Sequence, residues 1–349
     1  MKSKVMIMLI IISFLILLMT GCAQPNDPES PEENVYLELQ AVYETEGYVM
    51  DVEIGEHYLY VAEDEGGFSI FDTSTDTLCS RVRGHDDGEF FYSFSNIKLI
   101  SVDETSNALL VYNKYGTQLG IHIFDIRDRS NPVWKFIHTG NLSDISDLKT
   151  TSIDSTQFQF YWFYSGSKYY SGRFYDMNGN WQIIGETDED FSFDVNQFDE
   201  HFDTGLIYCA SKQLGMKVVN KVDFSTLGTI STTGQTISVK VVDNIAYLGN
   251  REEGINVVDI SDLNNPVELF SYDTWGLASD IAVNSELNVF ALASTSGGVY
   301  LFNGPEGEIR RLQCIDDSEI GYTYLVRIQG NLLYVGTRYG VYKYAIINL

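Results

Sequence analysis

The chain has 349 residues, a formal net charge of −27 at pH 7, and a composition in which 13% of the residues are aromatic. A charge of this sign and size excludes nucleic acid as the expected ligand, because binding to phosphate groups needs a basic face. It also argues against a folded domain that lies directly on an anionic lipid surface.

Residues 1–21 are expected to be a signal peptide. Lys2 and Lys4 give a positively charged start, and residues 5–19 form an apolar run that is short for a membrane span. The run ends at Thr20-Gly21-Cys22, which resembles the cleavage site of lipoproteins and would make Cys22 the lipid-attachment residue. An uncleaved anchor and an ordinary secretory signal are the alternatives. All three place the rest of the chain outside the cytoplasm.

Residues 22–34 are predicted to be the lipidated cysteine and a disordered tether. The segment AQPNDPESPEEN contains half of the prolines of the chain and no apolar residue after its first alanine. Such a segment cannot bury enough apolar surface to offset the entropy lost on folding. We therefore expect one folded domain, residues 35–349.

A repeat with a period of roughly 40 to 50 residues runs through this domain. In each copy an apolar strand such as 58–62 precedes a glycine, and an alternating strand such as 68–72 follows it. One further strand lies on either side of this pair. Seven copies of four antiparallel strands predict an all-β fold, a seven-bladed β-propeller. The marker glycines are Gly67, Gly120, Gly172, Gly215, Gly254, Gly298 and Gly340.

The two ends of the repeat array are expected to close the ring. The last copy stops soon after its third strand, at residues 341–344, and an additional strand at 35–43 precedes the first copy. We expect this N-terminal strand to complete the last blade. That pairing would remove an open sheet edge, which would otherwise favour aggregation.

The repeat resembles a known family. Its fullest form contains Ala246-Tyr-Leu, Gly254, Val257-Val-Asp-Ile-Ser261 and Pro266, and this pattern is similar to the LVIVD repeat of bacterial and archaeal cell-surface proteins. The resemblance implies a β-propeller and a location at the cell surface. It implies no particular activity.

The innermost strand of each blade should border a central channel and contains the best candidate site. A first ring of side chains is largely acidic, and it consists of Asp51, Asn96, Asp147, Asp194, Ser238, Asp280 and Leu325. Two residues later, on the same face of each strand, lies a largely basic ring of Glu53, Lys98, Lys149, Asn196, Lys240, Ala282 and Arg327.

Four aspartates of the first ring form the candidate channel-mouth site for a ligand or cation: Asp51, Asp147, Asp194 and Asp280. Carboxylate oxygens suit Ca²⁺ or Mg²⁺. The alternative is that the two rings neutralise each other and that the aspartates form hydrogen bonds with backbone groups at the strand starts.

Residues 158–175 are unusually rich in aromatic side chains. They supply a candidate aromatic surface that consists of Tyr161, Trp162, Tyr164, Tyr169 and Tyr170. Exposed tyrosine and tryptophan rings stack on sugars or anchor partner proteins. The alternative is that these rings fill the space between neighbouring blades.

Three cysteines remain besides Cys22. Cys209 lies in an apolar strand and should be buried. Cys79 and Cys314 fall near the outer strands of the first and sixth blades, which are not neighbours in a ring of seven. We therefore expect no disulfide, although an exported protein would permit one.

Recognised catalytic motifs are absent from the sequence. The five histidines show no HExxH spacing, and there is neither a GxSxG motif nor a Walker loop. The sequence therefore favours a lipid-anchored binding or assembly module at the outer membrane or cell surface, with a protein or glycan partner and no resident cofactor. The alternatives are a metal-dependent lactonase- or lyase-like enzyme that uses the acidic channel site, and a carbohydrate-binding surface protein.

Overall fold

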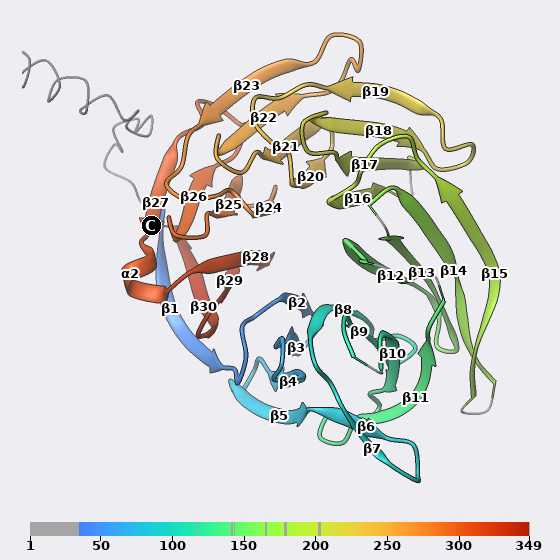
Figure 1. Ribbon diagram of the computed structural model, residues 1–349. Helices are drawn as coiled ribbons and strands as arrows, with labels where there is room; N and C mark the ends of the chain where they lie inside the picture. The colour runs from blue at the N-terminus through green and yellow to red at the C-terminus, as the bar shows by residue number, and fades with distance from the viewer. Residues whose placement is uncertain are drawn as a thin grey trace, which may run out of the picture.

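The computed structural model describes residues 35–348, apart from 117, 141, 143, 165, 178–179 and 202–203. The predicted signal peptide, Cys22 and the tether lie outside the described residues. Within them, seven four-stranded antiparallel sheets are arranged as blades around a central channel (Figure 1). The predicted all-β propeller of seven four-stranded blades is confirmed.

The strands of the first six blades follow one another in chain order from the channel to the rim. The first blade consists of β2 (Asp51–Ile54), β3 (Tyr58–Ala62), β4 (Phe68–Asp72) and β5 (Thr77–Val82). The second consists of β8 (Ile97–Asp103), β9 (Ala108–Asn113), β10 (Gly120–Asp125) and β11 (Val133–His138). The third consists of β12 (Asp147–Asp154), β13 (Gln157–Tyr164), β14 (Lys168–Met177) and β15 (Asn180–Asp190). The fourth consists of β16 (Gln197–His201), β17 (Leu206–Ala210), β18 (Met216–Asn220) and β19 (Thr226–Ile230).

The remaining blades follow the same plan. The fifth consists of β20 (Ser238–Val242), β21 (Ile245–Gly249), β22 (Ile255–Asp259) and β23 (Val267–Tyr272). The sixth consists of β24 (Asp280–Asn284), β25 (Val289–Ala293), β26 (Val299–Asn303) and β27 (Arg311–Ile315). The seventh consists of β28 (Thr323–Gln329), β29 (Leu332–Thr337), β30 (Gly340–Asn348) and the N-terminal strand β1 (Val35–Glu44).

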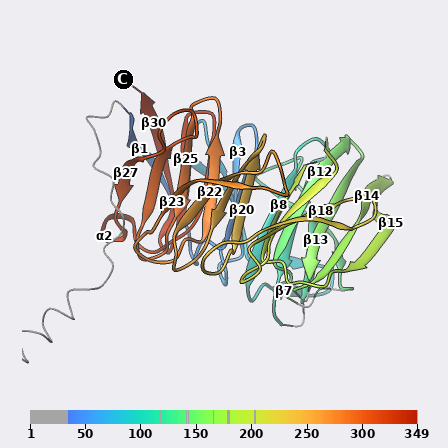
Figure 2. The ribbon, with the colours of Figure 1, turned by 90° about the horizontal axis from the view of Figure 1, so that it is seen from above.

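Two small elements lie between blades. The hairpin β6 (Gly84–Asp86) and β7 (Phe91–Ser93) follows the first blade, and the four-residue helix α2 (Asp317–Ile320) follows the sixth (Figure 2). Asp316 caps α2, because its side chain accepts a hydrogen bond from the backbone N–H of Ser318. No helix in the described part of the chain has both the length and the apolar character needed to cross a membrane.

The hydrophobic core is divided among the seven junctions between blades. The described residues form seven buried clusters, each drawn mainly from two neighbouring blades. The second strand of each blade supplies both adjoining clusters; in β3, for example, Tyr60 faces blade 2 and Leu59 faces blade 7. A four-stranded sheet with two apolar faces is only marginally stable alone, so each blade depends on its neighbours.

The N-terminal strand completes the last blade, as predicted. It pairs antiparallel with β30, from Val35 opposite Asn348 to Glu44 opposite Gly340. Tyr43 is buried in the cluster between blades 7 and 1, and its hydroxyl donates a hydrogen bond to Asp76 of the first blade. Lys343 of β30 binds the same carboxylate at 2.8 Å. The two ends of the chain are therefore joined both by a strand ladder and by side chains.

The third blade departs from the repeat. Gly172 does not precede the third strand, as its alignment with the other marker glycines predicted, but lies inside β14. A Cβ there would lie 2.7 Å from the ring of Phe160, so the glycine makes room for an aromatic side chain. At Gly254 the predicted role holds, because its φ is +72° and a Cβ would lie 2.1 Å from the Tyr272 carbonyl oxygen.

The cysteine predictions hold within the described residues. Cys79, Cys209 and Cys314 form no disulfide with one another, and Cys209 is fully buried. Burial raises the pKa of the Cys209 thiol above its usual range, and the nearby Glu200 carboxylate adds to the effect. The ring is therefore closed by strand pairing and packing rather than by a disulfide.

Candidate functional site

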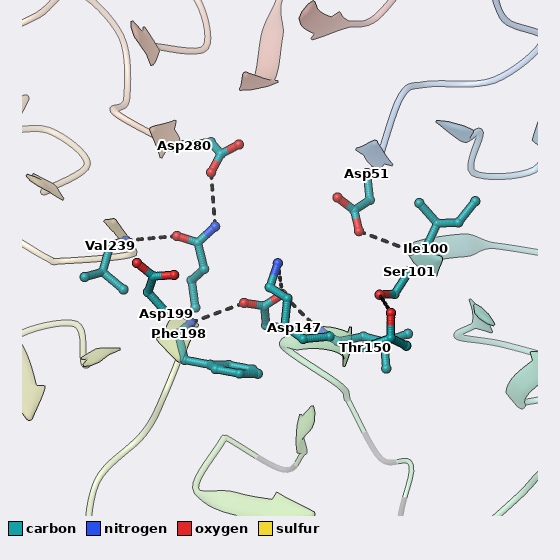
Figure 3. A network of polar contacts seen from close by, with 12 residues as sticks. Asp51, Ile100, Ser101, Asp147, Thr150, Phe198, Asp199, Val239 and Asp280 are labelled. Carbon is teal, nitrogen blue, oxygen red and sulfur yellow. Dashed lines mark hydrogen bonds and ion pairs between the residues drawn. The ribbon is translucent and has the colours of Figure 1, made fainter. Parts of the chain in front are cut away.

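Three of the four predicted channel aspartates occupy equivalent places at the starts of inner strands. Asp51, Asp147 and Asp280 begin β2, β12 and β24, and each is buried. Each carboxylate accepts a hydrogen bond from a backbone N–H of the next blade in the ring, and Figure 3 shows the bonds of Asp51 and Asp147. The donors are Ile100 to Asp51 at 3.1 Å, Phe198 to Asp147 at 3.2 Å and Val326 to Asp280 at 3.1 Å. These side chains thus join neighbouring blades. This agrees with the alternative in which the aspartates form hydrogen bonds with backbone groups.

The predicted position of Asp194 in this ring is wrong. Its side chain lies before β16, is 58% exposed and pairs with Lys212 at 3.1 Å. Strand pairing instead places Gln197 in the ring, because Gln197 lies opposite Ala210 as Asp51 lies opposite Ala62. The amide of Gln197 accepts from the Val239 N–H at 2.9 Å and donates to Asp280 at 3.0 Å.

The ring residue predicted for the second blade is also wrong by three positions. Asn96 lies before β8, and its place in the first ring is taken by Leu99. Lys98 lies at a bulge of β8, where its ammonium group donates to the Ile145 carbonyl oxygen at 3.1 Å. Corrected by strand pairing, the second ring consists of Glu53, Ser101, Lys149, Asp199, Lys240, Ala282 and Arg327.

Opposite charges of the channel pair with one another. Lys240 binds Asp199 at 2.8 Å, and Lys149 lies 3.4 Å from Asp147. Arg327 binds Asp51 at 3.0 Å and also binds Asp280, so it connects the seventh blade to its two neighbours. The two rings therefore largely neutralise each other.

A cavity of about 370 Å³ lies within the channel and is lined by residues of the second ring. Burial raises the pKa of Asp51 to about 7, although the charge of Arg327 opposes this. Burial also acts to raise the pKa of Asp199, but hydrogen bonds from His201 and Lys240 outweigh it and hold that pKa at about 2. The charged side chains that line the cavity include two ion pairs, Lys240 with Asp199 and Arg327 with Asp280.

The channel aspartates do not converge as metal ligands would. Across the ranges that the structure describes, no group of three or more His, Cys, Asp or Glu side chains is arranged to hold a metal ion. Asp51, Asp147 and Asp280 use their oxygens on backbone N–H groups, and Asp194 lies apart from them. The geometry therefore gives no support to the predicted Ca²⁺ or Mg²⁺ site.

The predicted aromatic surface of the third blade is wrong. Its five rings are at most 5% exposed. They pack into the clusters on the two sides of the blade, Trp162, Tyr164 and Tyr170 toward blade 2 and Tyr161 and Tyr169 toward blade 4. The alternative, that these rings fill the space between blades, is what the structure shows.

Exposed aromatic side chains gather instead on one face of the ring. We call it the loop face: it is formed by the loops that join the second strand of a blade to the third, and the fourth strand to the next blade. Bridges such as Arg251 to Ala278 hold these two kinds of loop together. Among the described residues, the exposed aromatic side chains of this face are Tyr48, Phe90, Phe91, Tyr115, Trp275 and Tyr339.

The opposite face lacks this feature. Among the described loop residues of the opposite face, Val222 is the large hydrophobic residue whose side chain is exposed. Sequence reasoning missed the aromatic residues of the loop face because each stands alone in a loop, without a period. The signal that could have found them is their position in the repeat, because they all lie in connections at the same end of the antiparallel strands.

Comparisons with known proteins agree with the repeat. Residues 46–78 and 233–274 match the LVIVD repeat. The chain thus contains two regions with LVIVD repeats. No match to it was found among curated proteins.

The LVIVD propeller is similar to solved structures at low sequence identity. U3-55K is 12% identical, with a TM-score of 0.65 over 91% of this chain and 100% of that one. The β-propeller domain of Cps50 (Swd1) from Myceliophteria thermophila is also 12% identical, with a TM-score of 0.61 over 89% and 99% of the two chains. The computationally designed Ika8 protein is 14% identical, with a TM-score of 0.57 over 89% and 100%. These likenesses show the fold alone.

Proposed function

We propose that this LVIVD propeller is a binding module, held outside the cytoplasm by a lipid on Cys22, that engages a partner protein through its loop face. A propeller with LVIVD repeats suggests a protein-binding or scaffold module. The observation that supports the choice of face is the concentration of exposed aromatic side chains there. Aromatic residues are enriched among the anchors of protein interfaces.

The backbone of the Trp275 loop is held in place by hydrogen bonds. Trp275 is 62% exposed, yet its backbone N–H donates a hydrogen bond to the Tyr300 hydroxyl at 3.2 Å and its carbonyl oxygen accepts one from the Ser294 hydroxyl at 2.6 Å. Its loop is also anchored to blade 5 by the Arg251 to Ala278 bridge. An anchor that is already ordered loses little conformational entropy on binding.

Co-purification from membranes after mild crosslinking tests this proposal. We expect one recurrent partner with the wild-type protein, and a large loss of it when Phe90, Phe91, Tyr115 and Trp275 are all changed to serine. The matched control is Val222→Ser, because Val222 is 87% exposed on the opposite face. Equal recovery from the fourfold variant and the control would overturn the choice of face. Recovery of no repeatable partner by the wild-type protein would overturn the function.

A further inference from the structure

A polar cleft lies on the loop face where the first and last blades meet. We call it the seam cleft. Its volume is about 450 Å³, which is within the range of sites that hold small ligands. It is lined by three loops: residues 45–48 after β1, Asp64 and Glu65 after β3, and Arg338 and Tyr339 after β29. A ligand here would touch both ends of the closed ring.

Tyr339 provides a flat apolar platform in the seam cleft. Its ring is 60% exposed and its other side lies against Gly321, where a Cβ would lie only 2.6 Å from Cε2 of the ring. The backbone N–H of Tyr339 donates to the Thr337 hydroxyl at 3.0 Å. The ring is therefore supported from below and accessible from above, as stacking on a ligand requires.

Arg338 provides hydrogen-bond donors beside this platform. Its guanidinium group stacks on the ring of Tyr48, 5.4 Å from the centroid, and its backbone N–H donates to the Tyr322 carbonyl oxygen at 3.0 Å. Among the described residues no carboxylate forms an ion pair with it. The stacking fixes the plane of the guanidinium group. Its N–H groups also lie within hydrogen-bonding reach of the Tyr324 and Tyr339 side chains, and since a guanidinium has five N–H donors it can still donate to a ligand.

Glu65 provides an acceptor on the other side. It is exposed, and none of the described residues forms a hydrogen bond or ion pair with its carboxylate. The other acids of the cleft are engaged, since Asp64 accepts from Asn96 and Glu46 binds Arg81 and Arg83. The cleft thus combines one open ring, one donor group and one acceptor group.

We propose that the seam cleft binds a saccharide. A sugar ring has an apolar face that stacks on an aromatic ring, and hydroxyl groups that both donate and accept hydrogen bonds. A basic peptide is the competing occupant, because Glu65 would attract a cation while Arg338 would repel it. This assignment rests on the proposed binding function, since it names a ligand class for one part of the loop face.

Calorimetric titration of the full-length, detergent-solubilised protein tests the assignment. The probes are maltotriose, chitotriose and trigalacturonic acid, with hexa-arginine as the peptide alternative. We expect saturable binding of at least one trisaccharide. Tyr339→Ala should weaken it roughly tenfold through loss of stacking. Tyr339→Phe should stay within about twofold, because the ring remains. Tyr115→Ala, a change on the same face at the second blade, should have no effect.

Three results would overturn the saccharide site. They are no saturable binding of any trisaccharide, binding that Tyr339→Ala leaves unchanged, and Tyr339-dependent binding of hexa-arginine alone. Thermal unfolding checks that the Tyr339 variants fold as the wild type does. If trisaccharides fail while the crosslinked partner is still recovered, only this assignment fails. If both measurements fail, the proposed binding function fails with it.

Discussion

Asp280 shows how one channel side chain serves several blades. Its carboxylate accepts from the Val326 N–H at 3.1 Å and the Gln197 amide at 3.0 Å, and it pairs with the guanidinium of Arg327. Burial acts to lower the pKa of Arg327, but Asp280 and Asp51 outweigh it and raise that pKa above its usual range. Arg327 therefore stays charged and needs its carboxylate partners.

We predict that Asp280→Ala lowers the free energy of unfolding by about 3–5 kcal/mol, because it removes a buried carboxylate and leaves the part-buried guanidinium of Arg327 partly uncompensated. Urea unfolding followed by far-UV circular dichroism measures the change. Asp194→Ala is the matched control and should cost less than about 1 kcal/mol, since that aspartate forms only an exposed ion pair. Equal effects of the two substitutions would contradict the structural role given to Asp280.

His122 is a buried neutral histidine at the base of the β6–β7 hairpin. Its Nδ1 accepts from the Trp134 indole N–H at 3.3 Å, so Nε2 carries the proton and donates to the Gln118 carbonyl oxygen at 3.0 Å. Burial lowers the pKa of His122 to about 4, the Gln118 carbonyl opposes this, and His85 adds to it. Protonation would also break the bond from Trp134.

This pKa predicts a loss of stability in acid. The unfolded chain binds a proton at His122 near pH 6.5, whereas the folded chain binds it only near pH 4. The contribution is therefore present above pH 6.5 and is lost as the pH falls toward 4, by roughly 3 kcal/mol. The free energy of unfolding, measured across this range, should depend less on pH in His122→Gln than in the wild type. The exposed-site control His57→Gln should keep the wild-type slope, and an equal slope in all three proteins would refute the prediction.

At the scale of the strand, β1 closes the ring chiefly through Tyr43. Tyr43 is 1% exposed, packs on Phe71 of the first blade and lies 6.5 Å from Tyr334 of the seventh. Tyr43→Ala should cost about 3–5 kcal/mol, the range for removal of a buried aromatic ring. Its neighbour Val42, on the other face of β1, is 42% exposed, and Val42→Ala should cost well under half as much. Thermal unfolding compares the two variants, and equal losses would contradict the role given to Tyr43.

The strands and the closure could be predicted from the sequence because the repeat fixes them. The register of the inner strands could not. Asp194-Val195 has the same residue types as Asp51-Val52, but the backbone N–H of Asn196 binds the Ala210 carbonyl oxygen at 2.9 Å, as the N–H of Met50 binds Ala62. Strand β16 therefore begins three residues later than Asp194. A pattern of residue types does not reveal which N–H begins the ladder.

The prediction of an aromatic surface on the third blade was wrong for a related reason. Consecutive aromatic residues on one strand point to opposite faces, so a run of them predicts burial on both sides as well as it predicts a surface. Tyr161 and Trp162 take opposite sides of β13, toward blades 4 and 2. The exposed rings of the loop face are single residues, whose positions follow from topology and not from composition.

At the scale of the whole molecule, the lipid on Cys22 is the proposed link to the membrane. Cys22→Ser should move the protein from the membrane fraction to the soluble extracytoplasmic fraction, because one substitution removes the acylated thiol while leaving the propeller unchanged. Fractionation followed by immunoblotting measures the shift. Cys79→Ser is the matched control and should remain in the membrane fraction. Retention of Cys22→Ser there would favour an uncleaved anchor.

The most direct test of the proposed binding through the loop face is position-resolved photo-crosslinking in intact cells. A photoreactive phenylalanine would replace Trp275 or Tyr115 on the loop face, or Val222 on the opposite face. We predict the same crosslinked partner from both loop-face positions and none from position 222. A partner captured from position 222, with both loop-face positions silent, would contradict it.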